Sequence, residues 1–320
     1  MDRRGAARRN LKAAALLVVC AAPALAASSS RLPLAALRWT EPTLALDAAT
    51  RQPSECLALP GDPAERARIE VGRAAFRTPL LLGGQAARLG LSCDSCHVEG
   101  RGNPAFRFPG LSGAPGTADV TAPLMSARRG DERFDPRPIP DLAAPGKIGD
   151  AALGSFVHGL IVEEFDGREP PPAVLEGLVA YVRAIDTKAC PARLDEPVTA
   201  AASADAAVRA VGAARERLAA GDPESARLML GAARSMLGRL AERYADLPRP
   251  RTRLRDADAE LRAFTGRLET RPFEVGTAIA AWLHRSERWR GELARAEPRS
   301  LYNRALLTAV LAPSPPRPAR

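Results

Sequence analysis

Apolar residues recur at helical spacing along most of the C-terminal part of the chain. They form four stripes with steps of mostly three and four residues, separated by short breaks that contain Pro or Gly. This pattern predicts a four-helix antiparallel bundle over residues 200–311. The stripes are Val208, Val211, Arg215 and Leu218; Met229, Ala233, Met236, Leu240, Tyr244 and Leu247; Leu254, Ala257, Leu261, Phe264 and Leu268; and Val275, Ile279, Trp282, Ser286, Trp289 and Leu293.

Two further helices are indicated in the N-terminal half. Asp62 is suited to cap a helix that begins at Pro63 and runs to about Phe76. The second helix runs from Pro172 to Asp186, with apolar residues along one side. Together with the C-terminal stripes, these helices predict an all-α protein.

The other segments show little periodicity. Residues 27–60 are irregular, with a short strand near Leu44, residues 191–199 form a linker, and residues 312–320 form a disordered tail. Residues 77–150 are rich in Gly and Pro, and a loop of that length is expected in a compact domain only if it has a function such as wrapping a bound group.

The sequence Cys93-Asp94-Ser95-Cys96-His97 has the spacing of a haem attachment motif. Two thiols three positions apart can add to the two vinyl groups of one porphyrin, and the following histidine then ligates the iron. A thioredoxin-like dithiol, half of a zinc site and a structural disulfide are the alternatives. The motif predicts one covalent haem c, with His97 as the proximal ligand.

The N-terminus has the pattern of a secretory signal peptide. Five basic residues in the first twelve precede an apolar run from Ala13 to Ala22, and Ala24-Leu25-Ala26 is a small-x-small cleavage site. Residues 1–26 are therefore expected to be removed, Cys20 with them, and the mature protein is expected in the periplasm. The alternative is a retained N-terminal anchor. No other apolar stretch is long enough for a transmembrane segment.

Charge narrows the choice of partners. The formal net charge is +9, and the predicted signal peptide contributes five basic residues and one acidic residue, which leaves 9 − (5 − 1) = +5. The basic residues are nearly all arginines, interleaved with Asp and Glu and without an aromatic stacking surface, so no nucleic acid is expected as a partner.

Residues 60–190 resemble the cytochrome c fold. In that family a glycine of the N-terminal helix lets an aromatic residue of the C-terminal helix approach, and Gly72, Phe76 and Tyr181 match this pattern. The sequences 71–76 and 91–97 are most similar to one haem domain of the bacterial di-haem cytochrome c peroxidases. Those enzymes carry two haem motifs, whereas this chain has one. The resemblance implies a cytochrome c-like haem domain at 61–190.

Two cysteines outside the haem motif stay in the mature chain, Cys56 and Cys190. They flank the two predicted helices of the haem domain, whose ends the resemblance implies to be close together. We therefore expect a Cys56–Cys190 disulfide in an oxidising compartment, with two free thiols as the alternative.

Few residues are candidates for the sixth iron ligand. His158 lies 61 residues after His97 (158 − 97), close to the separation in class I cytochromes c. Met125 lies 28 residues after His97 and is the alternative. An iron with an open or water-bound sixth position is the third option.

Two functions follow from these options. The first is transfer of one electron between periplasmic redox partners, with the C-terminal helices available for docking a partner protein. The second is reduction of hydrogen peroxide at an open haem, for which Glu163 or Glu164 are the nearest acid/base candidates. A purely structural role of the C-terminal helices is a third class. The missing second haem motif favours electron transfer.

Overall fold

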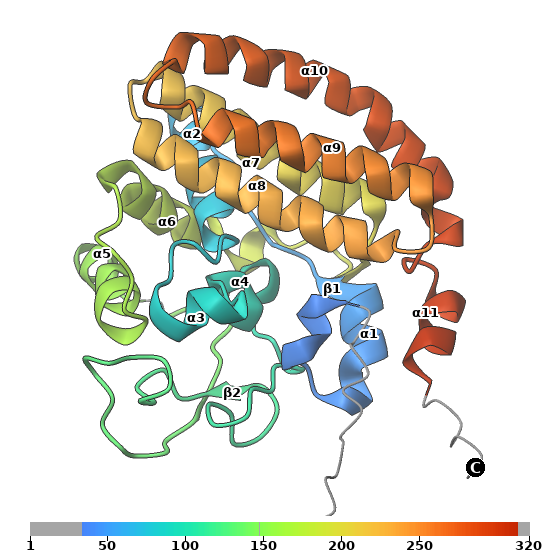
Figure 1. The fold of residues 1–320 in the computed structure, drawn as a ribbon. Coiled ribbons are helices and arrows are strands. Elements are labelled where there is room, and N and C mark those ends of the chain that lie inside the picture. The colour runs from blue at the N-terminus through green and yellow to red at the C-terminus, as the bar shows by residue number, and fades with distance from the viewer. Residues whose placement is uncertain (1–33, 147, 313–320) are drawn as a thin grey trace, which may run out of the picture. The chain divides into compact units, whose positions relative to one another are not determined.

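Figure 1 shows a computed structural model that describes residues 34–146 and 148–312. The predicted signal peptide lies outside the described residues, as does the tail from residue 313 onward. The described chain is mostly helical, which confirms the all-α class. Its strands are short and form two antiparallel pairs: β1 (Arg51–Pro53) with β4 (Asp195–Pro197), and β2 (Thr117–Ala118) with β3 (Arg137–Pro138).

The segment expected to be irregular contains short helices. The 3-10 helices η1 (Ala35–Trp39) and η2 (Pro42–Leu44) lead into helix α1 (Ala45–Thr50). Leu44 thus ends a helix, and the strand begins seven residues later, at Arg51. Its partner, β4, lies in residues 191–199, which the sequence predicts to be a linker. Both segments are extended because they pair with each other across a long stretch of sequence.

Helices α2 (Pro63–Phe76) and α6 (Pro172–Ala184) cross in direct backbone contact. Asp62 caps α2 by accepting hydrogen bonds from the amides of Ala64 and Glu65. A Cβ atom added to Gly72 would lie 1.8 Å from the carbonyl oxygen of Gly177, so only two glycines permit this approach. Next to the crossing, the rings of Phe76 and Tyr181 meet edge to face with centroids 5.2 Å apart.

Between these two helices the chain forms short elements joined by loops. They are α3 (Gly84–Leu89), α4 (Cys93–Cys96), the 3-10 helix η3 (Val98–Gly100), β2, β3, α5 (Asp150–Gly159) and the π-helical turn η4 (Leu160–Glu164). After α6 the 3-10 helix η5 (Thr187–Ala189) leads to β4.

Four long helices follow, namely α7 (Ala200–Ala219), α8 (Pro223–Arg243), α9 (Pro248–Thr265) and α10 (Pro272–Ala296). Helix α7 packs on α8 and α10, and α9 packs on the same two helices (Figure 1). Helices η6 (Glu297–Arg299) and α11 (Arg304–Leu311) end the described chain, where α11 contacts α1. No helix in residues 34–146 or 148–312 has the length and apolarity that a membrane crossing requires.

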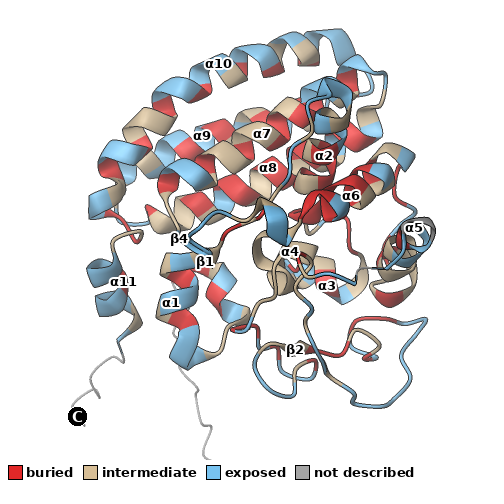
Figure 2. Cartoon of the chain, turned by 180° about the vertical axis from the view of Figure 1, so that it is seen from behind, coloured by how far each residue is buried: buried red, intermediate tan, exposed pale blue. Residues whose placement is uncertain are grey.

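The C-terminal helices share one hydrophobic core with α2 and α6. Helix α2 contacts both α7 and α8, and the buried side chains of all these helices form a single cluster. Figure 2 shows this burial on the sides of α2, α6, α7 and α8.

The stripe expected on α7 is partly wrong. Arg215 is exposed and Val208 only half-buried, whereas the buried face consists mainly of alanines such as Ala204, Ala207 and Ala214. Alanine occurs on every side of this helix, so it gives no apolar periodicity. Its small side chain nevertheless allows α2 and α8 to pack closely.

We expect Gly72→Ala to destabilise the protein strongly. The added methyl group overlaps the α6 backbone, and moving the helices apart would break the Phe76–Tyr181 contact. The free energy of unfolding should therefore fall by about 3 kcal/mol. Gly212→Ala in α7 is the control, because nothing lies within 4 Å of the added Cβ there. The free energy of unfolding of this control should rise by about 0.5–1 kcal/mol, because alanine favours the helix more than glycine does. Urea unfolding of both variants measures the difference, and equal effects would contradict the role of the crossing.

Candidate functional site

Cys93 and Cys96 lie on the one-turn helix α4 and are not disulfide-bonded. The turn is held in place by hydrogen bonds from the Ser92 amide to Ser95 Oγ (3.0 Å) and from Asn103 Nδ2 to the Ser95 carbonyl (2.9 Å). Burial raises the pKa of both thiols to about 12. A thioredoxin-like dithiol needs a lowered thiol pKa, so this environment is the opposite of a redox-active pair.

The orientation of His97 suits a metal ligand. Its Nδ1 lies 3.0 Å from the carbonyl oxygen of Pro140. A carbonyl only accepts, so Nδ1 carries the proton and Nε2 carries the lone pair. Burial lowers the pKa of His97, and the bond to Pro140 offsets this only in part, so the ring is kept neutral. A neutral imidazole whose other nitrogen donates to a carbonyl is the usual arrangement of a metal-ligating histidine.

Two apolar clusters meet at α4. Cys93 packs against the core of the long helices, whereas Cys96 packs against a second cluster, which we call the Met125 cluster. The two thiols therefore lie at the boundary between two apolar clusters. The buried members of the Met125 cluster are Leu82, Ala86, Leu91, Phe106, Phe108, Leu111, Ala118, Ala122 and Met125.

The two candidate sixth ligands differ in their surroundings. Met125 is 1% exposed and belongs to the same cluster as Cys96. The His158 side chain is 34% exposed, and its Nε2 lies 2.8 Å from a carboxylate oxygen of Glu169. The structure thus places Met125 in the apolar cluster that packs against Cys96, and it places the His158 ring next to the exposed carboxylate of Glu169.

The two glutamates proposed as acid/base groups also differ. Glu163 pairs with Arg129 at 2.6 Å at an exposed position. Glu164 is 8% exposed, and burial raises its pKa even though Arg129 lies 3.4 Å away. Phe165, the next residue, packs against the Met125 cluster, so Glu164 is the better placed of the two.

A buried charge network adjoins the motif and had no signal in the sequence. The Arg77 side chain is 6% exposed and contacts Glu55 (3.0 Å), Asp94 (3.7 Å) and Glu99. Glu55 accepts a hydrogen bond from the Tyr181 hydroxyl at 2.8 Å. We call Glu55, Arg73, Arg77, Asp94, Glu99 and Tyr181 the Arg77 network.

The network holds its central carboxylate ionised. Burial would raise the pKa of Glu55, but the guanidinium groups of Arg77 and Arg73 and the Tyr181 hydroxyl outweigh it and keep that pKa below its usual value. Because Asp94 and Glu99 flank His97 in the chain, Arg77 ties the loop that carries the motif to helix α2.

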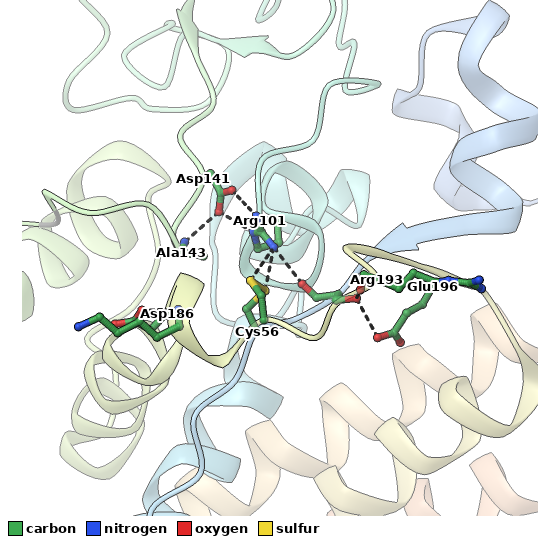
Figure 3. The surroundings of a disulfide bond; sticks show 10 residues. Cys56, Arg101, Asp141, Ala143, Asp186, Arg193 and Glu196 are labelled. Atoms are coloured by element: carbon green, nitrogen blue, oxygen red, sulfur yellow. Dashed lines mark hydrogen bonds and ion pairs between the residues drawn. A yellow bond between two sulfur atoms is a disulfide. The ribbon is translucent and has the colours of Figure 1, made fainter.

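The structure contains the expected disulfide between Cys56 and Cys190. The two Cα atoms are 4.1 Å apart, below the roughly 7 Å beyond which two cysteines cannot be joined. Figure 3 shows Arg101 beside the sulfur atoms and Asp141 on the other side of Arg101. Neither residue had a signal in the sequence, because arginines and aspartates are frequent throughout the chain.

Comparison of the chain with protein-family models, with curated proteins and with solved structures finds no match. The function is therefore inferred from the residues of the site.

Arg77→Met should destabilise the protein by about 3–5 kcal/mol, because it leaves Glu99 as a buried carboxylate without its arginine partner and removes one of the two arginines that pair with Glu55. The control is Arg137→Met, which removes an exposed ion pair with Asp135 and should change stability by less than about 0.5 kcal/mol. Urea unfolding at neutral pH compares the two variants. Similar small losses would show that the network does not hold the motif loop.

Proposed function

We propose that this chain is a mono-haem c-type cytochrome that carries one electron between redox partners. Cys93 and Cys96 would hold the haem through thioether bonds, and His97 Nε2 would ligate its iron. The observation that carries the proposal is the His97–Pro140 hydrogen bond beside two unpaired cysteines at haem spacing. The resemblance to one haem domain of the bacterial di-haem cytochrome c peroxidases agrees with it.

When bound, the haem would supply an iron that cycles between the ferric and ferrous states. The chain's own residues set its surroundings. The Pro140 carbonyl makes the His97 imidazole a stronger donor, and the Met125 cluster excludes water.

Met125 is the proposed sixth ligand in place of His158. Its position in the cluster with Cys96 supports this choice, as does the pairing of His158 with Glu169. A Met/His pair of ligands raises the reduction potential, which suits transfer from a donor of moderate potential.

The rest of the chain is proposed to serve this haem. Residues 61–190 would be a cytochrome c-like haem domain and residues 200–311 a four-helix antiparallel bundle, which shares with α2 the core against which Cys93 packs. The N-terminal pattern and the Cys56–Cys190 disulfide support export to the periplasm. A redox partner protein is the expected partner, docked by the C-terminal helices.

Reduction of hydrogen peroxide is the second candidate function. The buried carboxyl group of Glu164, with its raised pKa, has the property expected of a proton donor and acceptor. Peroxide needs an open position on the iron, so this function and ligation by Met125 exclude one another.

The protein, produced with an intact cytochrome maturation system, should carry haem that survives acid-acetone extraction and stains after denaturing electrophoresis. Cys93→Ala together with Cys96→Ala should abolish the stain, because both thioether bonds are lost. Cys56→Ala together with Cys190→Ala is the control and should keep it. A colourless wild-type protein would refute the haem proposal.

Met125→Ala should convert low-spin iron to high-spin iron and open it to carbon monoxide, because a ligand is lost. His158→Ala should leave the absorption spectrum unchanged. The reverse result would assign the sixth position to His158. A wild-type spectrum that is already high-spin, with peroxide turnover that Glu164→Gln lowers, would support the peroxidase instead.

A further inference from the structure

The disulfide lies against a guanidinium group near the predicted haem ligand. Arg101 Nη1 lies 2.9 Å from Cys56 Sγ and 3.6 Å from Cys190 Sγ, and it donates to the Ser54 carbonyl at 3.3 Å (Figure 3). The Arg101 side chain is 14% exposed, so these contacts are largely shielded from water. The bridged segment therefore fixes one edge of the guanidinium group.

The other edge of the same group holds Asp141. Arg101 Nε and Nη2 each donate to one carboxylate oxygen of Asp141, both at 2.7 Å. This two-bond geometry fixes the direction of the carboxylate as well as its distance. The hydrogen bonds from Arg101 lower the pKa of Asp141, so the carboxylate stays ionised.

Asp141 directly follows Pro140, whose carbonyl accepts the hydrogen bond from His97 Nδ1. A continuous series of contacts thus leads from the disulfide through Arg101 and Asp141 to the imidazole ring. It joins segments that are distant in sequence, since Asp141 lies 40 residues from Arg101 and Cys190 lies 89 residues from it.

From this series we infer that Arg101, anchored by the Cys56–Cys190 disulfide, is a positioning residue for His97. It holds the Pro140 carbonyl in the direction that the Nδ1 proton requires. This inference rests on the proposed ligation of haem iron by His97. It adds a role for the disulfide beyond stability, since the disulfide would help to set the reduction potential.

The sign of the effect follows from the hydrogen bond. Donation from Nδ1 to a carbonyl makes Nε2 a stronger donor and stabilises ferric iron. Loss of Arg101 should loosen Pro140, weaken that bond and favour the ferrous form. The amide of Ile139 also donates to the Gly116 carbonyl (2.9 Å), and the amide of Leu142 donates to the Gly100 carbonyl (3.2 Å). Because these two bonds remain in the variant, the segment around Pro140 should shift without unfolding. We expect about a tenfold change in the reduction equilibrium, which is about 59 mV for one electron.

The first experiment compares Arg101→Met, Arg101→Lys and Asp141→Asn in the haem-loaded protein. The reduction potential should rise most in Arg101→Met. It should rise less in Arg101→Lys, because lysine keeps the positive charge but cannot make the two parallel hydrogen bonds to Asp141. Exchange of the His97 Nδ1 proton, followed by NMR, should become faster in the same order. The control is Asp195→Asn, which removes a surface pair with Arg51 near the disulfide and should change neither quantity.

The second experiment tests whether the Cys56–Cys190 disulfide acts through Arg101. Cys56→Ala with Cys190→Ala should raise the potential when Arg101 is present, and should add nothing in the Arg101→Met background, because the disulfide acts through that residue. Equal potentials and exchange rates in wild type, Arg101→Met and Asp141→Asn would overturn the inference while leaving haem attachment intact. A wild-type protein without covalent haem would overturn both. Arg101→Lys keeps the test valid if the other variants fold poorly.

Discussion

The backbone contact between Gly72 and Gly177 is the constraint on which the rest of the haem-motif half depends. It sets how close α2 and α6 can lie, and so it brings Phe76 and Tyr181 into ring contact. Phe76 in turn lies 6.3 Å from the His97 ring, measured between centroids. The same crossing brings the chain before α2 beside the end of α6, where Cys56 and Cys190 are joined. A larger residue at either glycine would therefore disturb both the motif and the disulfide.

The buried charges of the Arg77 network follow from how α2 is covered. Helix α6 lies on one side of α2, and α7 and α8 lie on another, so the arginines in its last turns reach little water. Desolvation of such charges costs more than a simple ion pair returns, so the network is a poor source of stability. We infer that its value lies in specificity, because Asp94 and Glu99 of the motif loop join Glu55 around Arg77 only when α4 is in place.

The sequence predicted what local patterns encode. Caps and periodicity located α2, α6 and most of the long C-terminal helices, and the cysteine count, with the helix crossing that the cytochrome c resemblance implies, predicted the Cys56–Cys190 pair. Contacts between distant segments carry no such pattern. The Pro140 carbonyl is a backbone group 43 residues from His97, and no side-chain type marks it. Sequence separation favoured His158 as a ligand, whereas burial, which no spacing reveals, favours Met125.

The C-terminal helices are connected to the motif by packing, although they contribute none of its residues. Cys93 packs against the same core that contains the buried faces of α7 and α8, and Arg209 of α7 reaches Glu70 of α2 at 3.8 Å. Glu70 pairs with Arg73, which also binds Glu55 in the Arg77 network. A series of ion pairs thus joins α7 through α2 to the Arg77 network, which holds the motif loop. This continuity favours the proposal that the helical region keeps the motif loop rigid, over one in which it serves only as a detached docking module.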